Sequence, residues 1–112
     1  MASRHSQLVK ACLDYLTCLG FESMPSKNLA TPHVDKAGGV RWSRGLLKPG
    51  VSDIVACSPH GRFVAVEVKI SPDRLRLEQE RFKAAVEARG GYWLEVRDTT
   101  EALIQAHKEG RI

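Results

Sequence analysis

Three charged side chains, set in two neighbouring apolar stretches, are the residues of this chain best suited to chemistry. Asp53 begins one apolar run, and Glu67 and Lys69 lie two residues apart inside the next. In a strand, side chains alternate between faces, so Glu67 and Lys69 would share one face while the valines around them occupy the other. Charges are rarely placed beside a core unless they are paired or hold a metal. The pattern therefore predicts a functional site.

The two acids and the lysine suit metal-assisted chemistry on a phosphate. Asp53 and Glu67 would repel each other if they met, and one would be protonated near neutral pH without a compensating charge. Mg²⁺ or Mn²⁺ supplies that charge, because these ions prefer oxygen ligands and keep waters that a phosphate can replace. The backbone carbonyl of Val68 is a further candidate ligand. Lys69 would position or help deprotonate an attacking water and offset the negative charge of the transition state.

The turn Pro59-His60-Gly61 predicts how the two apolar runs pair. A three-residue hairpin loop that ends in glycine is typical of a type I turn followed by a left-handed residue. In that register Asp53 falls directly opposite Glu67. A two-residue loop would instead pair Asp53 with Val66, whose side chain belongs to the other face. We therefore expect the two carboxylates to face each other across the hairpin.

Hydrophobic spacing and turn signals predict the other elements. Helices are expected over 4–19, within 72–89 and from about 101 to 109, and strands over 40–44, 51–57, 63–70 and 92–96. Segment 21–39 contains two prolines and a Gly-Gly pair, which favour a loop over most of its length. Asp98 and Glu101 have the spacing of a capping box, which predicts the start of the last helix. The order indicates an α/β fold with a mixed central sheet and flanking helices.

Gln79 is a polar residue on an otherwise apolar helix face. Leu75, Gln79, Phe82 and Val86 follow one another at intervals of four, three and four, so they share one side of the predicted helix. A glutamine in this position is either a boundary residue bonded to a backbone carbonyl or a residue that reaches the site. Spacing alone leaves both interpretations open.

Length and composition indicate one globular domain, which we take as residues 1–112. The 112 residues contain 43% hydrophobic residues, enough for a single core. No apolar run approaches the roughly 18 residues of a membrane helix, and the start of the chain lacks the apolar core of a signal peptide. The three cysteines have no metal-type spacing. We interpret them as reduced thiols of a cytoplasmic protein that has no membrane association.

Positive charge precedes the first acid of the site. The chain has a net charge of +4, and the segment 36–52 contains Lys36, Arg41, Arg44 and Lys48 without any acid. Such a run is either a solvated loop or a positive surface over which a polyanion approaches the site. The second interpretation makes Arg41, Arg44 and Lys48 candidate DNA-binding residues.

Asp53 followed by Glu67-Val68-Lys69 resembles the motif of the PD-(D/E)XK nucleases. Longer blocks extend the resemblance to one branch, the VRR-NUC (virus-type replication-repair nuclease) family, which is frequent in phages and in DNA repair nucleases. The blocks, which occur in order over most of residues 5–105, are Gly50–Val55, Pro59–Lys69, Leu75–Gln79 and Ala88–Gly91. The resemblance implies a restriction-endonuclease-like core with the element order αβββαβα.

The resemblance also implies roles for individual residues. Asp53 and Glu67 would be ligands of Mg²⁺ or Mn²⁺, Lys69 the catalytic lysine, and Gln79 a residue that enters the site from the following helix. Family members commonly have a glutamate near the start of the first helix, where this chain has His5. His5 either replaces that carboxylate as a metal ligand or is a surface histidine without a role.

A second departure concerns the helix that carries Gln79. The family pattern L-S-P-x-Q is Leu75-Arg76-Leu77-Glu78-Gln79 here, without the serine and the proline. This departure leaves the start of the helix open, because the serine cap and the N-terminal proline are the usual start signals.

The sequence therefore predicts a metal-dependent endonuclease that hydrolyses phosphodiester bonds in branched DNA. By resemblance it would act as a homodimer on four-way (Holliday) junctions, in the cytoplasm of a bacterial host if the protein is viral. A restriction-like or nicking nuclease for duplex DNA would use the same residues. The same pattern is also compatible with a catalytically weak DNA-binding module of this fold, and with a salt-bridge network that holds no ligand.

Overall fold

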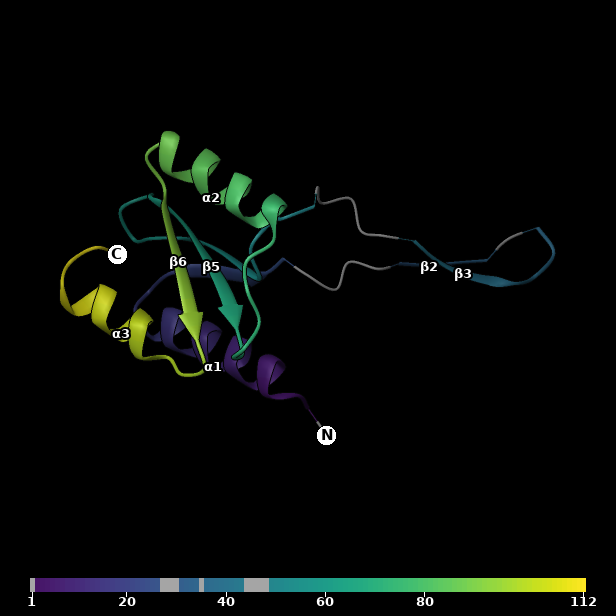
Figure 1. Ribbon diagram of the computed structural model, residues 1–112, viewed down its shortest axis with the longest axis horizontal. Helices are drawn as coiled ribbons and strands as arrows, with labels where there is room; N and C mark the ends of the chain where they lie inside the picture. Colours follow the sequence, from purple (N-terminus) through teal and green to yellow (C-terminus); the bar gives the residue numbers. More distant parts are fainter. Residues whose placement is uncertain (1, 27–30, 35, 44–48) are drawn as a thin grey trace.

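The chain forms a four-stranded mixed sheet with helices on both faces and a separate two-stranded hairpin. The computed structural model describes residues 2–26, 31–34, 36–43 and 49–112. Its elements are α1 (Arg4–Cys18), β1 (Glu22–Pro25), β2 (Thr31–Val34), β3 (Val40–Ser43), β4 (Ile54–Cys57), β5 (Phe63–Lys69), α2 (Leu77–Ala88), β6 (Tyr92–Arg97) and α3 (Glu101–Lys108). The main sheet has the order β1-β4-β5-β6, and the β2–β3 hairpin stands apart from it (Figure 1). This architecture confirms the fold class expected from the sequence.

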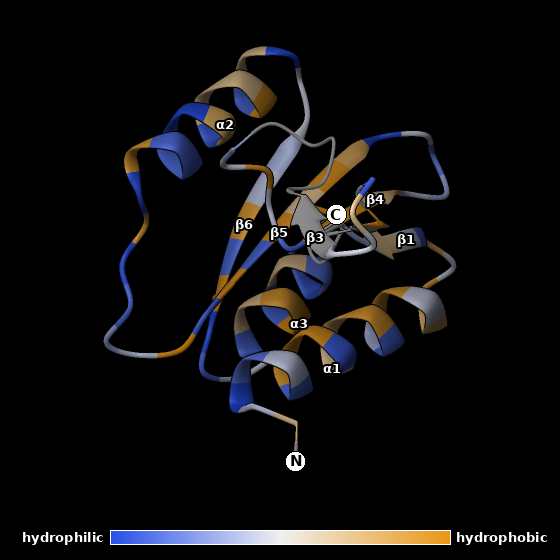
Figure 2. Cartoon of the chain, turned by 90° about the vertical axis from the view of Figure 1, so that its right-hand side faces the viewer, coloured by the Kyte–Doolittle hydropathy of each residue, from blue (hydrophilic) through white to orange (hydrophobic). Residues whose placement is uncertain are grey.

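The helices divide between the two faces of the main sheet, with α1 and α3 on one face and α2 on the other (Figure 2). Strand alternation explains the division. The side chains of Val64, Val66 and Val68 join the larger core, to which α1 and α3 contribute. Ala65 and Trp93 point the other way and form a smaller core with α2. In the main sheet β5 and β6 are parallel, and α2 connects them.

Helix α1 forms where the sequence predicts it. Leu8, Cys12 and Leu16, spaced by four, are its buried residues and face the sheet. The Ser3 hydroxyl accepts a hydrogen bond from the amide of Ser6 at the first turn, which satisfies one of the unpaired amides of the helix start. In the described ranges, no helix is long and apolar enough to cross a membrane.

The β4–β5 hairpin has the predicted turn and register. The amide of Gly61 donates to the carbonyl of Ser58 at 2.8 Å, and Gly61 has a φ of +83°, as a left-handed turn residue requires. Ile54 pairs with Val66, so the same register places Asp53 opposite Glu67. The expected strand 51–57 is shorter than predicted, because pairing with β5 begins at Ile54. Asp53 therefore lies one residue before β4.

The segment 21–39, predicted to be mostly loop, contains the two strands β1 and β2. Strand β1 pairs antiparallel with β4 and forms one edge of the main sheet. Pro25 ends this edge strand, a position where a missing backbone N–H is tolerated. The strand expected over 40–44 exists as β3, but it pairs with β2 and not with the main sheet. The αβββαβα order of the core is thus completed by β1, whose pairing with β4 is not visible in local sequence signals.

The predicted capping box at the start of α3 is also wrong. Thr100 is the cap residue, and its side chain makes no capping hydrogen bond. Asp98 has a φ of +64° and accepts hydrogen bonds from the Ser71 hydroxyl at 2.6 Å and from the Ser71 amide at 2.8 Å. These hydrogen bonds, the hydroxyl first, hold the pKa of the Asp98 carboxyl below its ordinary value. The carboxylate therefore ties the end of β6 to the end of β5 instead of capping α3.

Gly50 determines how closely α2 approaches the segment that leads to Asp53. Its φ is +92°, and a Cβ built on it would lie 2.2 Å from the carbonyl oxygen of Glu78. The helix backbone thus lies against a position that only glycine can occupy. Because Gln79 follows Glu78, this contact also places the candidate site glutamine.

We expect Gly50→Ala to lower the free energy of unfolding by about 2 kcal/mol or more, through a left-handed backbone and a clash with α2. Gly90→Ala is the matched control, since Gly90 has a similar φ of +84° and no atom within 4 Å of a built Cβ. It should lose only about 1 kcal/mol. Urea unfolding of both variants measures the difference, and equal losses would contradict the packing role of Gly50.

Candidate active site

One cleft of about 340 Å³ collects the predicted site residues at the end of the main sheet. It lies where the start of α1, the residue before β4, the end of β5 and the start of α2 meet. Its lining residues are His5, Asp53, Glu67, Val68, Lys69, Asp73, Arg76 and Gln79. Every metal-ligating or catalytic candidate from the sequence is among them.

Asp53 is held against the backbone of the neighbouring strand. Its side chain is only 2% exposed, and its Oδ2 accepts a hydrogen bond of 2.7 Å from the amide of Val68. Hydrogen bonds to an ionised acceptor are short and about twice as strong as neutral ones. The bond therefore orients the Asp53 carboxylate toward the end of β5.

Glu67 and Gln79 connect the strand to the helix. Glu67 is 1% exposed, and its Oε1 accepts a hydrogen bond of 3.3 Å from Nε2 of Gln79. The Oε1 of Gln79 accepts a second hydrogen bond, of 2.9 Å, from the amide of Arg76 at the start of α2. Gln79 thus bonds a backbone amide, where a boundary glutamine was expected to bond a backbone carbonyl, and it also contacts the Glu67 carboxylate.

Lys69 brings a cation into the cleft. The residue is 8% exposed, yet within the part of the chain that the structure describes, the ammonium group has no hydrogen-bond or ion-pair partner. Burying a charge without a partner is costly. An anion or a reacting water bound in the cleft would therefore stabilise the Lys69 ammonium.

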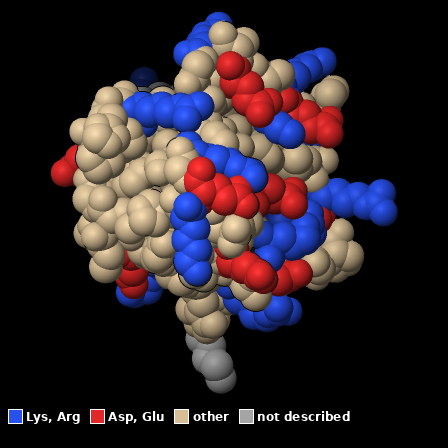
Figure 3. Space-filling view, turned by 90° about the vertical axis from the view of Figure 1, so that its left-hand side faces the viewer, with Lys and Arg blue, Asp and Glu red and all other residues tan. Residues whose placement is uncertain are grey.

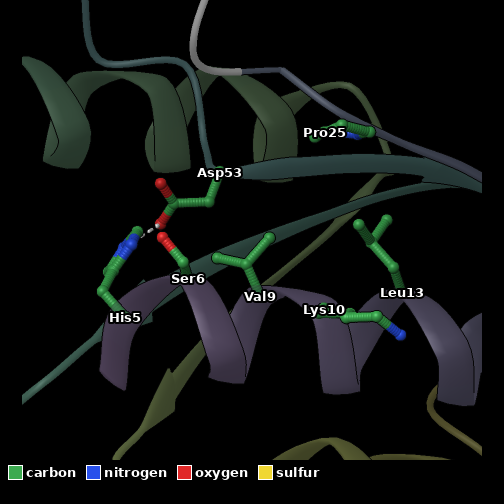
Figure 4. Close-up of a pocket in the computed structure, with 7 residues that line it drawn as sticks. All are labelled: His5, Ser6, Val9, Lys10, Leu13, Pro25 and Asp53. Atoms are coloured by element: carbon green, nitrogen blue, oxygen red, sulfur yellow. Dashed lines mark ion pairs between the residues drawn. The ribbon is translucent and has the colours of Figure 1, made fainter. Parts of the chain in front are cut away.

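His5 lies beside two of the candidate ligands. Its Nε2 is 3.4 Å from Oδ2 of Asp53 and 3.2 Å from the carbonyl oxygen of Val68. A second groove, of about 350 Å³, shares His5 and Asp53 with the cleft and continues along α1, as Figure 4 shows. The structure thus places His5, at the start of α1, beside Asp53 and the Val68 carbonyl.

The oxygens of the cleft fit a hard divalent cation. Asp53 and Glu67 offer carboxylates from adjacent strands, and Val68 offers a backbone carbonyl. Within the described ranges, no group of three or more His, Cys, Asp or Glu side chains is arranged to hold a metal. Mg²⁺ and Mn²⁺ prefer oxygen ligands such as these carboxylates and the carbonyl, and they also retain waters and accept phosphate oxygens.

Sequence reasoning missed four charged residues at or beside the cleft. Asp73 and Arg76 line it from the segment before α2. Glu95 and Arg97 lie on β6 next to Glu67 and Lys69 of β5, as the register of the parallel pair shows. A signal for the second pair exists in the sequence, because Glu95-Val96-Arg97 repeats the pattern of Glu67-Val68-Lys69.

The three basic candidates before the cleft are not tested by the structure. Arg44 and Lys48 lie outside the described residues, and Arg41 is placed only as a backbone position in β3. Their DNA-binding role stays a prediction.

Cys12 lies in the core near Asp53, and its thiol should be inert. Burial, followed by the negative charge of Asp53, raises the pKa of Cys12 from 9.0 to about 11. Because the folded pKa is raised, the stability that Cys12 supplies is present below pH 9 and is lost as the pH rises toward 11.

We expect iodoacetamide at pH 7.5 to modify the exposed Cys18 and Cys57 in the native protein, and Cys12 only after unfolding. Mass spectrometry of the labelled peptides measures the rates. Labelling of Cys12 as fast as that of Cys18 would show that it is not buried beside Asp53.

Two substitutions of Gln79 distinguish the effects of its two hydrogen bonds. Gln79→Met loses both and should cost about 1–3 kcal/mol of stability, because it leaves buried polar groups unsatisfied. Gln79→Glu keeps the acceptor for the Arg76 amide but sets a second carboxylate against Glu67, so MgCl₂ should stabilise this variant more than the wild type. Urea unfolding with and without MgCl₂ measures both effects.

Gln105→Glu is the matched control for this substitution, since Gln105 donates to Glu109 on the exposed face of α3. Its loss of stability should stay within about 0.5 kcal/mol. If Gln79→Glu gains no more from MgCl₂ than Gln105→Glu does, Gln79 does not contact a cation-binding carboxylate.

Comparison with known proteins agrees with the fold. No family model matches the sequence, and no curated protein matches it. A solved structure described as a VRR_NUC domain superposes on this chain with a TM-score of 0.65, over 96% of this chain and 97% of that one, at 16% sequence identity. The resemblance drawn from the sequence motifs is thereby confirmed at the level of architecture: the chain has the fold of a VRR-NUC nuclease domain.

Proposed function

We propose that this chain is a metal-dependent endonuclease that hydrolyses phosphodiester bonds in branched DNA. The observation that carries the proposal is the cleft at the end of β5, in which Asp53, Glu67 and Lys69 are all buried. A purely structural ion-pair network would need complete pairing. The Lys69 ammonium has no partner among the described residues, so such a network explains the site less well than a site for a ligand does.

Two carboxylates and the Val68 carbonyl would hold the divalent ion. When it is bound, Mg²⁺ or Mn²⁺ acts as a Lewis acid on a phosphoryl oxygen and makes an attacking water more acidic. The hydrogen bond from the Val68 amide to Asp53 fixes one carboxylate, and the hydrogen bond from Gln79 to Glu67 fixes the other. Preorganised ligands of this kind need no rearrangement when the substrate arrives.

Lys69 would act on the reacting groups directly. On the same strand face as Glu67, its ammonium can orient the attacking water by hydrogen bonding. It also offsets the negative charge that develops on the phosphate oxygens in the transition state. Lys69 is 8% exposed, and its charge is therefore less screened than it would be in water.

Branched DNA and a homodimer belong to the same proposal. One site cuts one phosphodiester bond, so symmetric resolution of a four-way junction requires two sites. A dimer with two-fold symmetry supplies them, since such dimers are the commonest protein oligomers. The resemblance to the VRR-NUC family supports both the substrate and the dimer.

A cleavage assay with defined substrates tests the proposal. Labelled four-way junction, flap, duplex and single-stranded DNA are incubated with Mg²⁺, Mn²⁺ or EDTA. The wild type should cut the junction with either metal and not with EDTA. Lys69→Ala and Glu67→Gln should each lower the rate by about 100-fold or more, as the loss of a catalytic group does.

Lys108→Ala, at an exposed position on α3, controls for the loss of one positive charge and should cut like the wild type. Paired symmetric nicks at protein concentrations that give a dimer in sedimentation would support junction resolution. Preferential cutting of plain duplex would favour a restriction-like nuclease. Binding of branched DNA without cleavage under either metal would leave only the DNA-binding module, and cleavage that survives both substitutions would refute the site.

A further inference from the structure

The charged residues of β5 and β6 form an unusual array on one face of the sheet. In the parallel register, Glu67 pairs with Glu95 and Lys69 pairs with Arg97. Val68 and Val96, which pair with each other between these two pairs, point into the core on the opposite face. The four charged residues thus form two rows across the strands: an acid row of Glu67 and Glu95, and a basic row of Lys69 and Arg97.

This order is the less favourable one for a sheet without a ligand. Like charges directly opposite each other on neighbouring strands are destabilising, whereas opposite charges stabilise. If Glu95 and Arg97 exchanged places, each would face an opposite charge on β5. The observed order is therefore better suited to binding ligands of opposite sign, a cation at the acid row and an anion at the basic row.

The basic row has the geometry of an anion site. Within the described part of the chain, the Lys69 ammonium has no partner. The Arg97 guanidinium pairs with Glu95 on the same strand, with Nε at 3.1 Å and Nη2 at 3.4 Å from the carboxylate oxygens. The side chains of Arg97 and Glu95 remain 33% and 30% exposed, so a ligand can reach them. Helix α2 packs on Ala65 and Trp93, farther back on this face.

The backbone holds the two basic residues at a constant spacing. The amide of Asp98 donates to the carbonyl of Lys69 at 3.0 Å, and the carboxylate of Asp98 accepts from Ser71. These hydrogen bonds thus hold the C-terminal ends of β5 and β6 together, immediately after Lys69 and Arg97. Adjacent strands lie about 4.8 Å apart, so these two cations can contact one anion or two successive phosphates.

We propose that Arg97, together with Lys69, binds the DNA phosphate next to the one that is cut. Without DNA, the Glu95 carboxylate pairs with the Arg97 guanidinium, and the phosphate displaces it on binding. The planar guanidinium suits phosphate because it donates two parallel hydrogen bonds. Positive charge is not gathered into a broad patch on the face shown in Figure 3, where acidic and basic side chains are interspersed. With Lys69 in the cleft and Arg97 beside it on the neighbouring strand, the bound DNA strand would run from the cleft across the end of β6.

The proposal rests on the proposed function, and DNA binding tests it without cleavage. Fluorescence anisotropy with a labelled four-way junction in EDTA gives Kd as a function of salt concentration. Arg97→Gln should raise Kd roughly tenfold and reduce the slope of log Kd against log salt by about one, the loss of one phosphate contact. Arg97→Lys should keep the slope and lose part of the affinity. Glu95→Gln should bind more tightly than the wild type.

Arg111→Gln is the matched control, because Arg111 also pairs with a glutamate two residues earlier, Glu109, and follows α3. Its salt slope should equal that of the wild type. Phosphates of the junction strand are then replaced one at a time by uncharged methylphosphonates. One position beside the cut site should weaken the wild type and leave Arg97→Gln unaffected.

Each result separates this inference from the nuclease proposal. An unchanged salt slope for Arg97→Gln in a protein that still cuts junctions overturns the phosphate site and leaves the nuclease intact. The expected slopes in a protein that cuts nothing support the phosphate site and overturn the nuclease. Weaker binding by Glu95→Gln refutes the competition between Glu95 and DNA, and no binding by the wild type refutes both proposals.

Discussion

Two acidic side chains buried opposite each other are the constraint on which the rest of this structure depends. Asp53 and Glu67 are almost fully removed from water, and their mutual repulsion would oppose folding without compensation. The amide of Val68 stabilises one carboxylate and the side chain of Gln79 stabilises the other. The hairpin register, the start of α2 and the start of α1 all converge on this point, because each supplies a group that lies against one of the two acids.

One face of the main sheet forms the core and the other carries the candidate site, and strand alternation separates the two. One face of β5 is entirely apolar and forms the main core with α1 and α3. The other face is covered by α2 over only part of its length, and beyond that part it carries the charged rows of β5 and β6. A charged site can therefore sit within a few residues of a dry core, since adjacent residues of a strand face opposite sides.

Much of the fold was predictable because its signals are local. The turn Pro59-His60-Gly61 determines the hairpin register through backbone conformation alone, and the four-residue spacing of Leu8, Cys12 and Leu16 predicts α1. Strand β1 was not predictable in this way. Its place at the edge of the sheet comes from pairing with β4, about 30 residues later in the chain. The capping box before α3 failed for a related reason, since Asp98 bonds to the distant Ser71 instead of the nearby helix.

For the candidate site, the sequence by itself determined which residues are candidates for chemistry and which strand faces they occupy. Alternation puts Glu67 and Lys69 together, and the turn brings Asp53 opposite them. The tertiary structure alone decided what surrounds these residues: His5 beside Asp53, the amide of Gln79 on Glu67, and the like-charged pairing of β6 with β5. The physical reason is that periodicity and turn geometry act over a few residues, whereas contacts between elements depend on how close-packed surfaces fit once the chain is folded.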